Sequence, residues 1–69
     1  RVVNFTTPVS IEDVLTFYYT RGVTAGYSAA RVAQGGDDIL GGTKGQSSYM
    51  VYARSTPSGR TEVDLVTSN

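Results

Sequence analysis

The sequence predicts a two-layer α+β fold in which one helix packs on a mainly antiparallel sheet, with the elements in the order β-α-β-β-β-β. Three observations support this prediction. A segment near the N-terminus has the pattern of a helix start, followed by apolar residues at helical spacing. Beyond residue 27 apolar and polar residues alternate, as they do in strands with one buried face. Clusters of Gly, Asp, Ser and Pro divide that region into short segments joined by turns.

Residues 2–7 are the first predicted strand, because β-branched side chains predominate there. Val3 and Phe5 share one side of this strand, and Val2 and Asn4 share the other. Pro8 ends the strand, since proline has no N–H to donate to a neighbouring strand.

A helix is predicted from residue 11 to about residue 25. Ser10 is its expected N-cap, because the hydroxyl can accept a hydrogen bond from a free backbone N–H one turn later. Asp13 then places a negative charge near the positive end of the helix. Gly22 is expected where the helix approaches the sheet closely. Gly26 is expected to end the helix in the left-handed conformation. The side expected to face the sheet carries Ile11, Val14, Leu15, Phe17, Tyr18 and Gly22.

Four short segments are expected to complete the sheet: residues 30–34, the apolar pair Ile39–Leu40, residues 47–54 and residues 61–67. Predicted turns separate them at residues 35–38, 41–45 and 56–59. The last two strands are expected to form a hairpin. Within it Tyr49 is predicted to face the helix, whereas Met50 and Tyr52 face away. One helix can cover only one face of the sheet, so we expect the opposite face to be free for a partner.

The composition argues against most enzymes. The 69 residues suffice for one small domain, residues 1–69, whose core is marginal at this size. The chain has no His, Cys or Trp, so it lacks the most versatile acid–base group, the most reactive nucleophile and the usual zinc ligands. We therefore expect no catalytic activity, no metal site and no cofactor.

The charge pattern narrows the class of partner. Six basic and six acidic residues cancel, and they are scattered along the chain. Nucleic-acid binding requires a basic surface that neutralises phosphates, so we do not expect it here. No apolar run reaches the roughly 20 residues that a membrane-spanning helix requires. The expected partner is another protein or a second copy of this chain.

Three local patterns have structural explanations that we prefer to functional ones. Glu12 and Asp13 are adjacent, so on a helix they diverge and cannot form a paired acid–base site. Asp37 and Asp38 follow two glycines, which favours a turn over a calcium site that would need about six to eight oxygen ligands. The glycine-rich residues 41–45 lack the spacing and the following helix of a phosphate-binding loop.

Aromatic residues are numerous for so short a chain, with five Tyr and two Phe. Most are expected in the core or in cross-strand pairs. Tyrosine is also enriched at the energetic centres of protein interfaces, and it can stack on a sugar. The candidate interface or ligand-binding residues are Tyr19, Tyr49, Met50 and Tyr52.

A family resemblance covers most of the chain. The pattern Pro8-x-Ser10-x-Glu12-Asp13-Val14-Leu15-x-Phe17-Tyr18, the exit Gly26-Tyr27 and the valine-rich residues 62–66 resemble small α+β domains of uncharacterised bacterial cell-envelope proteins and lipoproteins. The resemblance implies a capped helix followed by a β-meander. It also implies an exported bacterial protein, periplasmic or extracellular, without catalytic residues.

The leading hypothesis is a non-catalytic interaction or structural domain of an exported bacterial envelope protein. Self-association through the face that carries Met50 and Tyr52 is one form of this hypothesis. The alternative is a small-ligand module in which the glycine-rich loops and tyrosines such as Tyr19, Tyr49 and Tyr52 hold a saccharide-like molecule.

Overall fold

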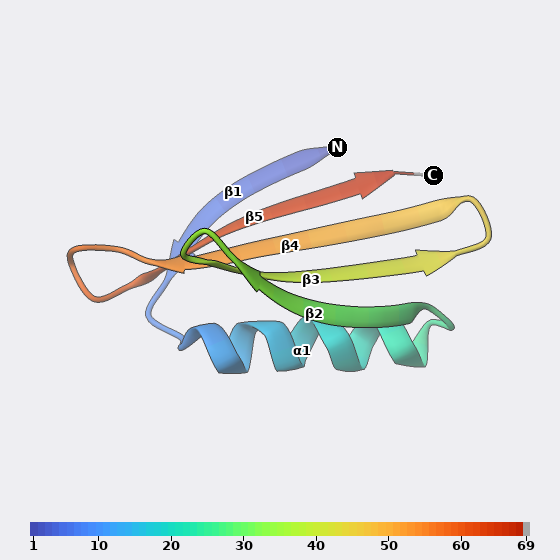
Figure 1. Cartoon of the computed structure of the whole chain (residues 1–69), viewed down its shortest axis with the longest axis horizontal. Helices are drawn as coiled ribbons and strands as arrows, with labels where there is room; N and C mark the ends of the chain where they lie inside the picture. The colour runs from blue at the N-terminus through green and yellow to red at the C-terminus, as the bar shows by residue number, and fades with distance from the viewer. Residues whose placement is uncertain (69) are drawn as a thin grey trace.

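The computed structural model describes residues 1–68 and shows one helix on one side of a five-stranded sheet (Figure 1). The elements are β1 (Val2–Thr7), α1 (Ile11–Thr24), β2 (Ser28–Gln34), β3 (Asp37–Lys44), β4 (Ser47–Ser55) and β5 (Thr61–Ser68). All neighbouring strands are antiparallel, in the order β1-β5-β4-β3-β2. The predicted fold class and element order are therefore confirmed.

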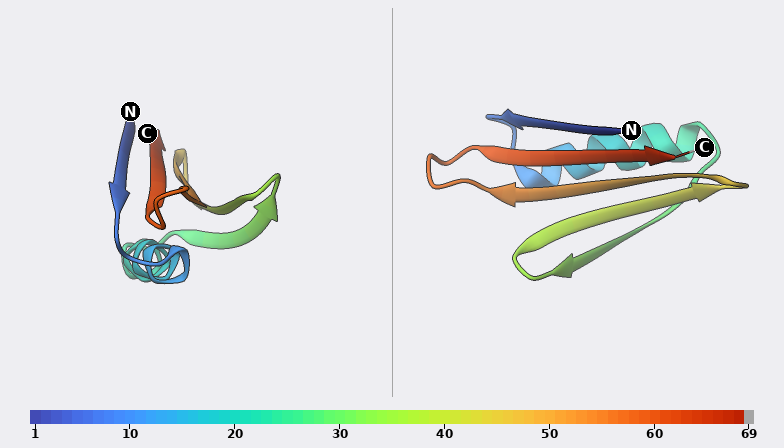
Figure 2. Two further views of the ribbon diagram at one scale, coloured as in Figure 1. Left: turned by 90° about the vertical axis from the view of Figure 1, so that its left-hand side faces the viewer. Right: turned by 90° about the horizontal axis from the view of Figure 1, so that it is seen from above.

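The path of the chain places its first and last strands side by side. β2 to β5 form a meander, and β1 then pairs with β5, so β1 and β2 are the two edges of the sheet. α1 carries the chain from one edge to the other. Figure 2 shows that the sheet is strongly twisted, with β2 and β3 turned away from β1 and β5. Thr61, which is buried, donates a hydrogen bond from Oγ1 to the carbonyl of Val9 at 2.7 Å and so ties the loop before α1 to β5.

Both ends of α1 follow the capping chemistry expected from the sequence. The Oγ of Ser10 accepts a hydrogen bond from the backbone N–H of Asp13 at 3.2 Å. At the other end Gly26 is left-handed, with φ of 96°. The N–H of Tyr27 reaches the carbonyl of Gly22 at 2.8 Å, which completes a Schellman motif. α1 has 14 residues, and no helix in the described part of the chain is long and apolar enough to cross a membrane.

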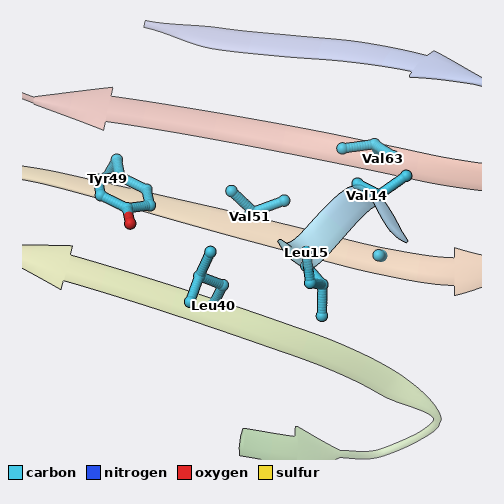
Figure 3. Packing of buried hydrophobic residues seen from close by; sticks show 7 residues of the cluster. Val14, Leu15, Leu40, Tyr49, Val51 and Val63 are labelled. Carbon is cyan, nitrogen blue, oxygen red and sulfur yellow. The ribbon is translucent and has the colours of Figure 1, made fainter. Parts of the chain in front are cut away.

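The core lies between α1 and the three strands β3, β4 and β5. Figure 3 shows Val14 and Leu15 of α1 close to apolar side chains of the sheet. The largest fully buried side chains are Leu15, Leu40, Val51 and Val63. Burying each such side chain contributes about 1.5–3 kcal/mol relative to leaving it in water. Leu15 alone comes from the helix, so it anchors α1 on the sheet.

The third strand is the main departure from the sequence-based expectation. β3 extends over Asp37–Lys44, whereas we predicted only the pair Ile39–Leu40 between two longer turns. The turns contain two residues each. Gly35 and Gly36 have φ of 60° and 84°, as in a type I′ turn, and Gly45 has φ of 60° while Gln46 is not positive, as in a type II′ turn. The predicted turn at residues 41–45 is therefore wrong, because most of these residues belong to β3.

Gly41 and Gly42 lie within β3 because side chains of β4 occupy the space beside them. Gly42 pairs with Tyr49, whose ring lies over it on the helix side of the sheet. Gly41 pairs with Met50, whose sulfur lies beside it on the other side. The glycines thus serve internal packing, which periodicity alone does not reveal.

Candidate functional site

The face of the sheet turned away from α1, which we call the open face, carries a continuous apolar strip. Strand register aligns Val32, Ile39 and Tyr52 across β2, β3 and β4. A neighbouring row aligns Met50 and Val66 across β4 and β5 and ends at Val2 on β1. The apolar strip comprises Val2, Val32, Ile39, Met50, Tyr52 and Val66. Within residues 1–68 no helix or strand packs on it.

The apolar strip is shielded in its middle and exposed at its ends. Ile39 is only 9% exposed, because Val32 and Tyr52 flank it on the neighbouring strands. Met50 and Tyr52 are half-buried. At the two edges of the sheet Val2 is 68% exposed and Val32 is 56% exposed. Apolar surface that runs across a whole sheet is a feature of interaction surfaces, whereas isolated exposed valines are ordinary.

A cluster of charges borders the apolar strip at the end nearest the β4–β5 turn. The guanidinium of Arg54 contacts Asp37 through Nε at 3.0 Å, Asp64 at 3.1 Å and Glu62 at 3.3 Å. The three carboxylates come from β3 and β5, on either side of β4. Because one positive charge meets three negative charges, the cluster is anionic at neutral pH. The hydrogen bonds that Arg54 donates, led by those to Asp37, raise the pKa of Arg54 and keep it charged.

Asn4 links this cluster to β1. Its Nδ2 donates to Asp64 Oδ1 at 2.6 Å and to Glu62 Oε2 at 3.1 Å. The hydrogen bond from Asn4, followed by that from Arg54, holds the pKa of Asp64 below its ordinary value. Every carboxylate of the cluster thus has a partner. The cluster is a structural border of the open face.

The structure does not bring the four candidate residues together. Met50 and Tyr52 lie on the open face, where the sequence placed them. Tyr19 lies on α1 and is 43% exposed, on the opposite layer of the molecule. Tyr49 is in the core and 9% exposed, so it offers no surface to a partner. A single site therefore includes at most Met50 and Tyr52.

Tyr49 occupies a slot between the helix and the sheet. Its ring lies between the backbones of Gly22 and Gly42 and meets the ring of Tyr27 edge to face, with centroids 5.2 Å apart. Its hydroxyl is buried, with no hydrogen-bond partner among the described residues. Burial raises the pKa of this phenol. Of the glycine-rich residues 41–45, which suggested a ligand-binding loop, Gly42 lies against one side of this ring, and Gly22 of α1 lies against the other.

A second surface, not expected from the sequence, lies between α1 and the edge strand β1. It is a groove of about 280 Å³. Phe17, predicted to face the sheet, is instead 53% exposed beside this groove, with Arg21 over its ring at 5.4 Å. Phe17 follows Leu15 by two residues, which turns it about 200° around the helix, so the angular spacing was a signal for its exposure. The groove is lined by Phe5, Thr7, Val9, Asp13, Val14, Phe17 and Tyr18.

Comparisons with known proteins identify no family for this chain. No protein-family model matches the chain, and a search of curated proteins gives no match either. The functional assignment is therefore argued from the surfaces described above.

Proposed function

We propose that this chain is a non-catalytic interaction domain of an exported bacterial envelope protein, and that it binds another protein through the open face of its sheet. The observation that carries the proposal is the apolar strip from Val32 to Val2, which crosses all five strands between polar borders. The exported location, periplasmic or extracellular, is supported by the family resemblance of the helix and the last strand.

The chemistry of the open face supports a protein partner rather than a small ligand. Its apolar residues form a broad surface, whereas small-molecule sites are concave and enclose most of the ligand. Tyr52 and Met50 lie near the centre of the strip, and both residue types are enriched in the buried core of protein interfaces. Arg54 and its carboxylates form a charged rim beside that centre.

Site-specific photocrosslinking in the bacterium that encodes the chain tests the proposal. The change Tyr52→p-benzoylphenylalanine places the reactive group on the open face. We expect a covalent adduct with one defined protein, identified by mass spectrometry after fractionation of the envelope.

The matched control is the same amino acid at Gln46, in the exposed β3–β4 turn. An adduct specific to position 52 supports the proposal. Equal adducts at both positions, or none at position 52, contradict it. An adduct found in the cytoplasmic fraction alone would contradict the exported location.

A further inference from the structure

We infer that β1 is a pairing edge for a second copy of this chain, and that two copies join their five-stranded sheets into one continuous sheet about a twofold axis at Asn4. This inference rests on the proposed function, because it names a second copy as one partner of the interaction domain. It adds a surface distinct from the open face: the backbone of β1 and the groove beside it.

The outward backbone groups of β1 are free to pair. Arg1 and Thr67 exchange two hydrogen bonds, each 2.8 Å long. Hydrogen-bonded pairs alternate along an antiparallel ladder, so Val3, Phe5 and Thr7 also direct their backbone groups toward β5. The N–H and C=O groups of the remaining residues, Val2, Asn4 and Thr6, therefore point away from the sheet. A second β1 strand centred on Asn4 would satisfy all of them.

The two edges of the sheet differ in their protection against such pairing. Natural proteins block an edge strand with a charge that points inward, with proline or with a bulge. β2 has such a charge: Arg31 lies on the helix side and binds Glu12 of α1, with Nη1 and Oε2 2.6 Å apart. β1 pairs with β5 over six consecutive residues and contains no charged residue and no proline. Of the two edge strands, β1 is therefore the one that a second strand can pair with.

Charge complementarity favours a second copy as the occupant of the groove beside β1. Pairing centred on Asn4 places Arg1 of one copy opposite Thr7 of the other. Both side chains then lie on the groove side, where Asp13 is exposed. Neither Arg1 nor Asp13 forms an ion pair within residues 1–68. The twofold axis would create two Arg1–Asp13 pairs and cover the exposed ring of Phe17 twice.

The anionic clusters on the open face oppose the pairing only weakly. Asp64 and its symmetry mate would be three strand spacings apart, about 14 Å at about 4.8 Å per spacing. The Debye length is about 8 Å at physiological ionic strength, so most of this repulsion is screened. In this register Val2 of one copy lies opposite Thr6 of the other, so the apolar strips of the two copies do not meet and the pairing rests on the backbone of β1 and the groove beside it.

Sedimentation of the purified chain across a concentration series tests the inference. We expect a monomer–dimer equilibrium in the wild type. Thr6→Pro removes an N–H that points outward, without breaking the β1–β5 ladder, and should raise the dissociation constant by about tenfold or more. The matched control, Ala33→Pro, makes the same change on β2. Gln34 and Asp37 close a two-residue turn, so the N–H of Ala33 also points outward and dimerisation should be unchanged.

Charge-reversal variants test the same inference without introducing a proline. Arg1→Asp and Asp13→Arg should each weaken the dimer, and the double variant should restore it. Hydrogen exchange of the wild type should show the amides of Asn4 and Thr6 protected at high concentration and exchanging rapidly at low concentration. A wild type that stays monomeric overturns the inference. So does a dimer that Thr6→Pro leaves intact, or a dimer in which the amides of Asn4 and Thr6 stay unprotected.

The two proposals fail separately. A monomeric purified chain whose position 52 still crosslinks to another protein would refute the pairing of β1 and leave the open face as an interaction surface. A dimer that depends on β1, with no adduct at position 52, would refute the role of the open face alone.

Discussion

The ring of Tyr49 lies directly against the backbone of Gly22, so that a side chain of the sheet fills the space where a helix side chain would stand. A β-carbon at position 22 would lie 2.9 Å from Cζ of Tyr49, closer than non-bonded carbons approach in folded proteins. The ring is also held by Gly42 and Tyr27, so it has little room to move. This contact sets the distance between α1 and β4.

Gly22→Ala should therefore destabilise the protein. In an exposed helix, alanine is more favourable than glycine by about 1 kcal/mol. Here the added methyl group overpacks the slot, and we expect a net loss of about 1–3 kcal/mol in the free energy of unfolding, measured by urea denaturation. Thr20→Ala, on the exposed side of the same helix, should change it by less than about 0.5 kcal/mol.

A smaller side chain at position 49 should relieve the clash. In a Tyr49→Val background, Gly22→Ala should cost less than it does in the wild type, with a coupling of about 0.5–3 kcal/mol. Additive effects would mean that the ring and the helix backbone do not limit each other.

The adjacent glycines of β3 should respond differently to the same substitution. Gly42→Ala places a methyl group against the held ring of Tyr49 and should cost about 1–3 kcal/mol. Gly41→Ala meets only the flexible side chain of Met50, with the sulfur 3.1 Å away, and Met50 is half-buried on the open face. Its cost should be clearly smaller. Thermal unfolding of the two variants checks the order, and a reversed order would contradict the assignment of faces in β3.

The orientation of α1 can be tested with three substitutions. Ser10→Ala removes the N-cap and should cost about 1 kcal/mol, whereas Ser10→Gly should cost only a few tenths. Leu15→Ala empties a fully buried site and should cost about 2–5 kcal/mol. Thr16→Ala, on the exposed side, should have little effect.

A loss of about 1 kcal/mol lowers the melting temperature of a domain of this size by roughly 4–8 °C, which calorimetry resolves. Equal effects at Leu15 and Thr16 would show that the helix is rotated from the position described.

The hydrogen bond from Asn4 to Asp64 predicts a pH-dependent contribution to stability. The folded pKa of Asp64 is below its ordinary value, chiefly through Asn4 and then Arg54. The stabilisation is therefore complete above the unfolded pKa of aspartate, about 3.9, and is lost as pH falls through the folded pKa. Asn4→Ala should lower stability at neutral pH, and its effect should shrink as the pH falls through the folded pKa of Asp64, below which Asp64 is protonated in both states.

Urea denaturation at several pH values measures this effect, and an NMR titration of the Asp64 carboxyl should show a higher pKa in the variant. Gln46→Ala serves as the control, because Gln46 is an exposed amide in a turn. If the effect of Asn4→Ala were the same at every pH, the hydrogen bond would not act through the charge of Asp64.

Local sequence signals predicted most of the secondary structure. The helix begins after Ser10 and stops at Gly26 because capping depends on residues within one turn of each end. The strands at residues 2–7, 47–55 and 61–68 alternate clearly, and their faces were predicted correctly. Tyr52 and Met50 were placed on the open face for the same reason.

β3 was predicted too short because glycine, judged from its sequence neighbours alone, indicates a turn. Gly41 and Gly42 are in a strand only because Met50 and Tyr49 of β4 fill the spaces beside them, and those contacts are absent from the local sequence. Phe17 was placed on the buried side because it is apolar and follows Val14 by three residues, whereas it lies about 200° around the helix from Leu15 and is exposed beside β1.

The sequence by itself determined the class of fold, the ends of the helix and the two faces of the clearest strands, because capping and side-chain alternation act over a few residues. Only the tertiary structure decided that β1 pairs with β5, that Tyr49 is enclosed by two glycines and that β1 is the unprotected edge. These features depend on contacts between residues far apart in the chain. The sequence around each of these residues does not indicate which distant residue it contacts in the folded sheet.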